Sequence, residues 1–189
     1  MAMLDRITNH PELFGLLRQS CEENGIGVRI CDEFMDNGQL REDTVRILKV
    51  DAYYSSRNMH SPPPAIDCLI IIETGEGAFG LTLVELKNIS STRKADLKPR
   101  AIRPKFDTVI EDFLSKEFAD IFLDNHIRIS HFRLWLVTNP YRWPPMSEEA
   151  YRKKLKNIAL KMFLSDKPYR FRGNVARIEP KQPGSEVCA

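Results

Sequence analysis

Three residues near the middle of the chain have the types and spacing that metal-assisted chemistry requires. Asp67 stands at the start of one apolar run, and Glu85 and Lys87 stand at the end of the next. A glycine-rich turn centred near Glu76 predicts a β-hairpin in which Asp67 lies directly opposite Glu85. Side chains on a strand repeat with a period of two, so Lys87 shares a face with Glu85. The sequence therefore predicts two carboxylates and an amine at one end of a hairpin.

This hairpin is expected to lie inside the protein, because both of its faces are apolar over residues 66–72 (IDCLIII) and 81–87 (LTLVELK). An unpaired buried carboxylate is costly, so two adjacent ones favour a shared metal ion or proton. Mg²⁺ prefers oxygen ligands, and a bound Mg²⁺ polarises a phosphate and activates a water molecule. A neighbouring lysine can orient or deprotonate that water, or neutralise the developing charge. The pattern fits phosphodiester hydrolysis.

The apolar spacing along the chain predicts the elements that position these residues. Helices are expected at residues 11–24, 104–125 and from Ser147 onward. Strands are expected at residues 44–54, 66–72, 81–87 and 132–138. Residues 88–103 form a basic connection in this scheme. The order predicts one α/β domain over residues 1–178 around a mixed sheet flanked by helices, followed by a flexible tail at 179–189.

The motifs resemble those of the PD-(D/E)XK nuclease superfamily, which has the restriction-endonuclease-like fold. The matching segments are Ala65-Ile66-Asp67 and, about eighteen residues later, Glu85-Leu86-Lys87. The expected element order is also similar to that family's αβββαβ core, here with an added C-terminal helix, and the resemblance covers residues 9–139. The chain departs from the family pattern in having Ile66, rather than proline, before Asp67.

The resemblance implies roles for individual residues. Asp67 and Glu85 would be metal ligands, and Lys87 would be the water-activating base or an electrophile. Many members have a further glutamate on the first helix, for which Glu23 is the nearest candidate. The implied activity is that of a Mg²⁺-dependent endodeoxyribonuclease, with Mn²⁺ able to substitute, acting on double-stranded DNA as a homodimer. Restriction, phage or mobile-element, junction-resolving and repair nucleases all fit this description.

The net charge of +2 conceals a segregated pattern. Residues 87–105 carry seven basic side chains and one acidic one, and residues 141–181 form a second basic block. The first block begins at Lys87, so it is expected to border the site and to contact phosphates. A single basic residue is more often simply solvated. The candidate DNA-contacting residues are Arg57, Asn58, His60, Asn88, Ser90, Ser91, Arg93, Lys94, Lys98, Arg100, Arg103 and Lys105.

Several other classes of protein are excluded at this stage. The G-x-G-x-x-G run from Gly75 to Gly80 leads into a strand rather than a helix, so no nucleotide cofactor is expected. The chain has no run of 18 apolar residues and no signal-peptide pattern at its start, so we expect a cytoplasmic protein without a membrane role. For such a chain a disulfide framework is not expected among Cys21, Cys31, Cys68 and Cys188.

Two other functions remain open. The chain could be a non-catalytic nucleic-acid-binding module that kept the nuclease fold, or an α/β partner-binding protein. In either case Glu85 and Lys87 would form an ion pair at a strand end. Acid-x-Lys triplets also arise by chance, because Asp96-Leu97-Lys98 and Glu179-Pro180-Lys181 occur in loop-like sequence. Only the triplet at Glu85 ends a buried strand whose hairpin partner begins with an aspartate.

Overall fold

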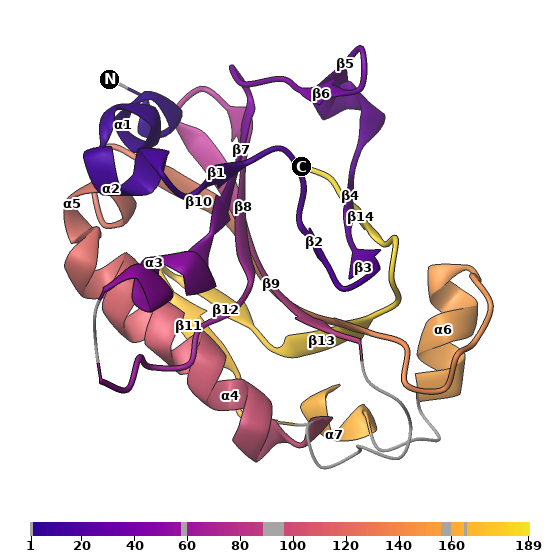
Figure 1. Ribbon diagram of the computed structural model, residues 1–189. Coiled ribbons are helices and arrows are strands. Elements are labelled where there is room, and N and C mark those ends of the chain that lie inside the picture. Colours follow the sequence, from indigo (N-terminus) through magenta and orange to yellow (C-terminus); the bar gives the residue numbers. More distant parts are fainter. Residues whose placement is uncertain (1, 58–59, 89–96, 156–159, 165) are drawn as a thin grey trace.

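A central mixed β-sheet organises the protein in a computed structural model that describes residues 2–57, 60–88, 97–155, 160–164 and 166–189 (Figure 1). The strands of this sheet are β1 (Leu17–Arg18), β7 (Val45–Lys49), β8 (Cys68–Gly75), β9 (Ala78–Lys87), β10 (Arg128–Thr138) and β13 (Ile178–Lys181). Within the described residues they pair in the order β1-β7-β8-β9-β10-β13. The pairs from β1 to β9 are antiparallel, whereas β10 runs parallel to both β9 and β13. The predicted α/β class with a mixed sheet is confirmed.

Helices cover one face of the sheet, on the left in Figure 1. They are α1 (Met3–Asn9), α2 (Pro11–Phe14), α3 (Val50–Ser56), α4 (Pro99–Thr108), the π-helical segment η3 (Val109–Glu117) and α5 (Ala119–Phe122). Buried aromatic side chains at helical spacing, including Phe106, Phe113 and Phe122, pack in one cluster with Leu69 and Leu83 of the sheet. Side chains from four further elements pack in the same cluster: α6 (Glu148–Leu155), α7 (Lys161–Leu164), and the hairpin strands β11 (Tyr169–Phe171) and β12 (Asn174–Ala176).

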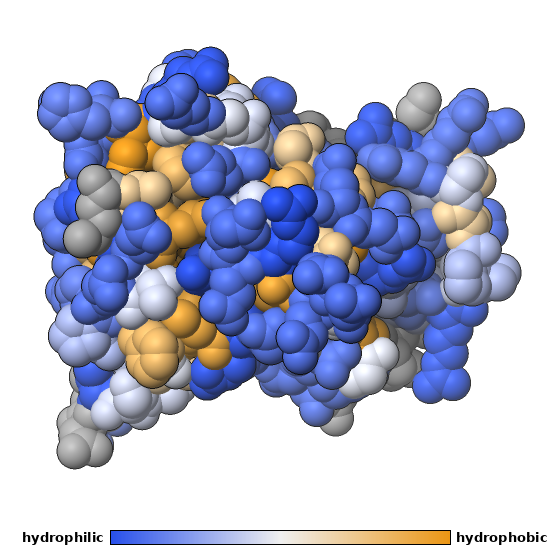
Figure 2. Space-filling view, turned by 90° about the horizontal axis from the view of Figure 1, so that it is seen from above, coloured by the Kyte–Doolittle hydropathy of each residue, from blue (hydrophilic) through white to orange (hydrophobic). Residues whose placement is uncertain are grey.

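Very short strands cover the opposite face (Figure 1). They are β2 (Glu22–Glu23), β3 (Ile26–Gly27), β4 (Arg29–Ile30), β5 (Met35–Asp36), β6 (Gln39–Leu40) and β14 (Glu186–Val187), with the 3₁₀ turn η1 (Asp32–Phe34) between β4 and β5. Their apolar side chains pack against Ile70, Val84 and Trp135 in a second core cluster. Seen from above, the molecular surface is mainly hydrophilic, with hydrophobic groups in smaller patches (Figure 2). No described helix has the length and hydrophobicity needed to cross a membrane.

The central hairpin has the predicted register. Cys68 pairs with Val84 and Ile70 pairs with Thr82, so the symmetry about Glu76 is confirmed. The strands are longer than predicted, and the turn is confined to Glu76 and Gly77, whose φ is +63°. The glycine-rich run is therefore a hairpin turn rather than a strand-to-helix phosphate loop, as its sequence context indicated.

The predicted helix over residues 11–24 is wrong. Helix α2 ends at Phe14, and Glu23 lies in the hairpin of β2 and β3 instead. Asn24 and Gly25 form the turn with φ values of 50° and 77°. An Asn-Gly pair is a strong signal for a two-residue hairpin turn, and this local preference overrides the helical spacing of the apolar residues before it.

The strand predicted at residues 44–54 also ends early, because β7 stops at Lys49 and α3 follows immediately. The rings of Tyr53 and Tyr54 pack on the helical face, and their hydroxyls donate to the carboxylates of Glu117 and Asp112 at 2.6 and 3.0 Å. Tertiary packing outweighs the strand propensity of these tyrosines.

The long helix begins earlier than predicted, at Pro99 rather than at Pro104. Proline is well suited to the first helical position, since it has no N–H to satisfy there. Ser147 was correctly predicted to precede a helix: the Ala150 N–H donates to Ser147 Oγ at 3.3 Å. Tyr151 and Leu155 are buried as predicted. Met162 is 39% exposed, contrary to prediction, and Lys156 and Ile158 lie outside the described residues.

The predicted flexible tail is wrong as well. β13 joins the central sheet beside β10, and β14 pairs with β4. The expectation of no disulfides is also wrong, because Cys21 is bonded to Cys68 and Cys31 to Cys188. The partners are 47 and 157 residues apart, so only the fold brings them together.

Candidate metal centre and active site

The central hairpin carries the two predicted carboxylates at its open end. Asp67 immediately precedes β8, and Glu85 lies near the end of β9. The pair next to them is Cys68 with Val84, so Asp67 and Glu85 are opposite each other in the same register. Both side chains are almost inaccessible, with 7% and 0% exposure. The structure thus brings both residues together where the sequence predicted them.

The carboxylate of Asp67 has one fixed oxygen and one that faces a cation. Its Oδ2 accepts a hydrogen bond from the Leu86 N–H at 2.7 Å. Its Oδ1 lies 3.5 Å from Lys49 Nζ. Burial raises the pKa of Asp67, although the Leu86 N–H, Lys105 and Lys49 oppose this shift. The hydrogen bond orients the carboxylate and leaves Oδ1 available to a cation.

Glu85 is more deeply buried than Asp67 and contacts two lysines. Lys105 Nζ lies 2.6 Å and Lys87 Nζ lies 3.4 Å from its Oε1. Its buried Oε2 has no hydrogen-bond partner among the described residues. Burial and, second, the charge of Asp67 raise the pKa of Glu85 to about 7. A buried oxygen of this kind needs a proton or a cation, so it fits an oxygen-ligated divalent ion.

Glu23 reaches the same site from the opposite face of the sheet. It offers a carboxylate oxygen within 4.8 Å of oxygens of Asp51 and Asp67, a separation that one cation can bridge. Lys49 Nζ lies 2.5 Å from Glu23 Oε2, and this hydrogen bond lowers the pKa of Glu23. Glu23 therefore joins the site as predicted, but from a hairpin rather than from the first helix.

Lys49 and Asp51 were not predicted from the sequence, although the sequence contains one signal for Lys49. Lys49 ends an apolar run (VRILK) just as Lys87 ends the run that contains Glu85. Because β7 pairs with β8, Lys49 is opposite Cys68 and therefore beside Asp67. Finding this neighbour requires the strand order, which a single hairpin pattern does not supply.

The predicted DNA-contacting residues divide into several groups. Lys105 points at Glu85 and belongs to the carboxylate site. Asn88 Nδ2 donates to the Asn24 backbone oxygen at 2.6 Å and joins the end of β9 to the β2–β3 turn. His60, Lys98 and Arg100 are exposed. The remaining candidates Asn58, Ser90, Ser91, Arg93 and Lys94 lie outside the described residues.

Two predicted arginines already have acidic and aromatic partners within the fold. Arg57 pairs with Glu117 at 2.9 Å and lies 4.2 Å above the Tyr53 ring. Arg103 pairs with Asp166 at 2.8 Å and lies 4.6 Å above the Tyr169 ring. These contacts give both arginines a structural role that the sequence did not indicate.

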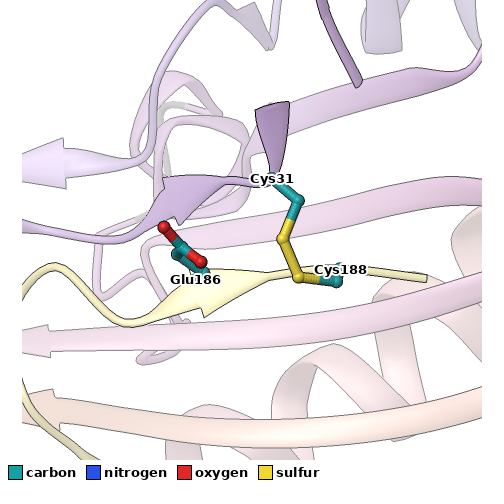
Figure 3. A group of neighbouring side chains, drawn as sticks. All are labelled: Cys31, Glu186 and Cys188. Atoms are coloured by element: carbon teal, nitrogen blue, oxygen red, sulfur yellow. A yellow bond between two sulfur atoms is a disulfide. The ribbon is translucent and has the colours of Figure 1, made fainter. Parts of the chain in front are cut away.

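Two other parts of the molecule have features of a site. A hollow of about 650 Å³ lies beside Trp135, but its buried Lys181 already pairs with Glu148 at 2.6 Å and with Glu179 at 3.3 Å. Figure 3 shows Glu186 beside Cys31 and Cys188. The two sulfur atoms there are bonded to each other, and Glu186 pairs with Arg29 at 3.4 Å. The carboxylate site is therefore the better candidate.

Comparison of this chain with protein-family models, with curated proteins and with solved structures found no match in any of the three. The fold and the site consequently define only a class: an α/β protein with a central mixed sheet and, at one end of its central hairpin, two buried carboxylates paired with partly exposed lysines.

Proposed function

We propose that this chain is a Mg²⁺-dependent endodeoxyribonuclease with a restriction-endonuclease-like core. The observation that carries the proposal is the placement of Asp67 opposite Glu85, with Lys87 Nζ 3.4 Å from Glu85. The connectivity supports it: three antiparallel strands β7, β8 and β9 precede α4, and β10 then returns parallel to β9. This arrangement resembles the αβββαβ core of the PD-(D/E)XK nucleases.

The donor set fits Mg²⁺ because it consists of carboxylate oxygens and includes the buried Oε2 of Glu85. Asp67 and Glu85 would hold the ion, and Glu23, which offers an oxygen within 4.8 Å of an oxygen of Asp67, would add a further ligand. When bound, Mg²⁺ supplies Lewis-acid activation of the phosphate and lowers the pKa of a water molecule. Mn²⁺ has the same ligand preference and is expected to substitute.

The lysines supply the remaining chemistry. Lys87 is only partly buried and contacts Glu85, so its amine can orient the attacking water or neutralise the charge that develops on the phosphate. Lys105 neutralises Glu85 from the helical side. Leu86 holds Asp67 in one orientation through its N–H, which keeps the ligand geometry fixed.

The substrate in this proposal is double-stranded DNA. The exposed Lys98 and Arg100 at the start of α4 are available to contact phosphates. Nucleases with one site per chain usually cut both strands as two copies, so a homodimer is part of the proposal. The proposed protein is cytoplasmic. Its biological role would be that of a restriction, phage or mobile-element, junction-resolving or repair nuclease.

A second candidate is a non-catalytic nucleic-acid-binding module. One observation favours it: Lys49, Lys87 and Lys105 already pair with the carboxylates, so the cluster has cations of its own. In this case the salt bridges would be structural, and metal would add nothing.

Incubation of supercoiled plasmid with the protein and Mg²⁺ separates the two candidates. We expect nicked and linear products, which EDTA and Lys87→Ala abolish and which Lys116→Ala, on an exposed side chain of η3, leaves unchanged. No cleavage of duplex, branched or single-stranded DNA would contradict the proposed nuclease. Binding at low salt without cleavage would support the binding module, since phosphate contacts are strongest at low salt.

A further inference from the structure

Lys49 lies at the centre of a group of three carboxylates. Its Nζ is 2.5 Å from Glu23 Oε2, 3.4 Å from Asp51 Oδ2 and 3.5 Å from Asp67 Oδ1. The Lys49 side chain is only 22% exposed, and the three carboxylates each offer an oxygen within 4.8 Å of the others. The ammonium group thus lies close to all three carboxylates.

The backbone fixes Lys49 at this point. Lys49 is the last residue of β7 and is paired with Cys68 of β8, the residue after Asp67. The next N–H, that of Val50, donates to the Asp67 backbone oxygen at 3.0 Å. Asp51 follows in the first turn of α3. The Cys21–Cys68 disulfide joins the chain just before Glu23 to the same point of β8.

The charges in the site are close to balance without any metal. Among the described residues it contains four carboxylates, those of Glu23, Asp51, Asp67 and Glu85, and the three ammonium groups of Lys49, Lys87 and Lys105. Lys87 and Lys105 contact Glu85, so within the described residues Lys49 is the cation that contacts the other three carboxylates. A second cation placed among the same oxygens would be repelled by the ammonium.

We infer that Lys49 is a built-in counter-ion that holds Glu23, Asp51 and Asp67 together in the metal-free protein, and that a divalent cation binds only by displacing its ammonium from Asp67. The inference rests on the proposed function because it takes these carboxylates to bind a divalent ion. Lys49 is then a positioning residue that keeps the ligands assembled and weakens metal binding by competition. Neither role follows from the nuclease motif, which does not include this residue.

Calorimetric titration with Mn²⁺ in the absence of DNA tests the competition. Lys49→Met keeps the length of the side chain and removes its charge, so we expect it to bind Mn²⁺ about tenfold more tightly than the wild type or better. Lys49→Arg keeps the charge and should stay near the wild-type affinity. Lys116→Met, at a position 70% exposed on η3, is the matched control for loss of one positive charge. A folded Lys49→Met protein with unchanged or weaker Mn²⁺ affinity would overturn the inference.

Reductive methylation of the wild-type protein, read by mass spectrometry, gives a second test that does not depend on a variant's folding. Lys49 is expected to react slowly without metal and several-fold faster with saturating Mg²⁺, because displacement exposes its amine. The reactivity of Lys116 should not change. Unchanged or slower methylation of Lys49 in the presence of Mg²⁺ contradicts displacement.

The outcomes separate this inference from the proposed nuclease. If both results for Lys49 are obtained but every DNA stays intact, the counter-ion role stands and the nuclease fails. If the protein cuts DNA with Mg²⁺ and Lys49→Met binds Mn²⁺ no more tightly, the nuclease stands and the counter-ion role fails. Absence of Mn²⁺ binding by both the wild type and Lys49→Met also overturns the inference.

Discussion

The two faces of the central sheet are built by different means. The helical face is filled by large apolar side chains at helical spacing, such as Phe106, Phe113 and Phe122. The other face is covered by two-residue strands, tight turns and two disulfides. Periodic spacing specifies the first kind of face, whereas turn chemistry and long-range covalent links specify the second.

The candidate site lies where the two faces meet. Asp67 immediately precedes β8 and Glu85 lies in β9. Lys105 reaches Glu85 from the helical face, and Glu23 reaches Lys49 from the face with short strands. The site therefore depends on the packing of both the helical face and the face with short strands. Changes on each face should have different consequences for stability, and the site should respond to its own charges.

Phe113→Ala should have the largest effect on stability. Phe113 is fully buried, and its ring centroid is 4.6 Å from that of Phe118. Removing it should lower the free energy of unfolding by about 3–5 kcal/mol, because a large cavity remains. Urea denaturation measures the loss, with the exposed Phe14→Ala as the control. Equal midpoints for both variants would show that the helical face does not carry the main core.

Removal of the Cys21–Cys68 disulfide by a double substitution to alanine should have the next largest effect. The linked residues are 47 positions apart, and the bond is expected to contribute about 2–4 kcal/mol to the free energy of unfolding. Hydrogen exchange should show the loss of protection concentrated in residues 21–27. A native protein in which thiol titration detects four free cysteines would contradict this description of the face with short strands.

Glu85→Gln should stabilise the metal-free protein at high pH. Because the pKa of Glu85 in the folded state, about 7, exceeds its usual value of 4.5, the folded protein binds more protons than the unfolded chain between these values. The contribution of Glu85 to wild-type stability should therefore fall as pH rises from about 4.5 to about 7, and Glu85→Gln should lack this contribution. We expect the variant to be about 1–3 kcal/mol more stable at pH 8 in EDTA.

The measurement for this variant is urea denaturation at pH 5 and pH 8. The difference from the wild type should shrink at pH 5, where Glu85 is protonated in the folded protein. A Glu85→Gln protein that is less stable than the wild type at pH 8 would show that the pairs with Lys105 and Lys87 outweigh the burial of the charge.

Gly80→Ala should have the smallest effect of the four. A Cβ at Gly80 would lie 2.0 Å from ring atoms of His131 on the neighbouring strand, so the imidazole or the backbone must shift. The expected loss is about 1–2 kcal/mol. Gly75→Ala is the control, since no atom outside its chain neighbours lies within 4 Å of its Cβ position. If thermal unfolding gives equal midpoints, the His131 ring does not pack tightly against this strand.

The central hairpin and its carboxylates could be predicted from the sequence, because both depend on local patterns. Two continuous apolar runs and the turn near Glu76 predict the register that places Asp67 opposite Glu85. Glu23 was predicted as a member of the site, but the element that carries it was not. The Asn24-Gly25 turn was the available signal, and the helical spacing of earlier apolar residues obscured it.

Other parts of the structure depend on contacts between distant residues, which one sequence does not reveal. Lys49 joins the site only because β7 is the neighbour of β8. Residues 179–189 resemble a loose tail by composition, yet β13 completes the sheet and Cys188 is bonded to Cys31. In the sequence Lys105 resembles a DNA-contacting residue of a basic block, but in the structure it lies on α4 and pairs with Glu85.

The rate of plasmid cleavage by Glu85→Gln at pH 8 with Mg²⁺ tests the central claim most directly. Without metal this variant is expected to be at least as stable as the wild type, so it should be folded at the start of the assay. We predict that the wild type cuts the plasmid and that Glu85→Gln is slower by about a thousandfold or more, because one metal ligand is lost. Equal cleavage rates for the two proteins would contradict the assignment of Glu85 and Asp67 as the metal-binding carboxylates of a nuclease.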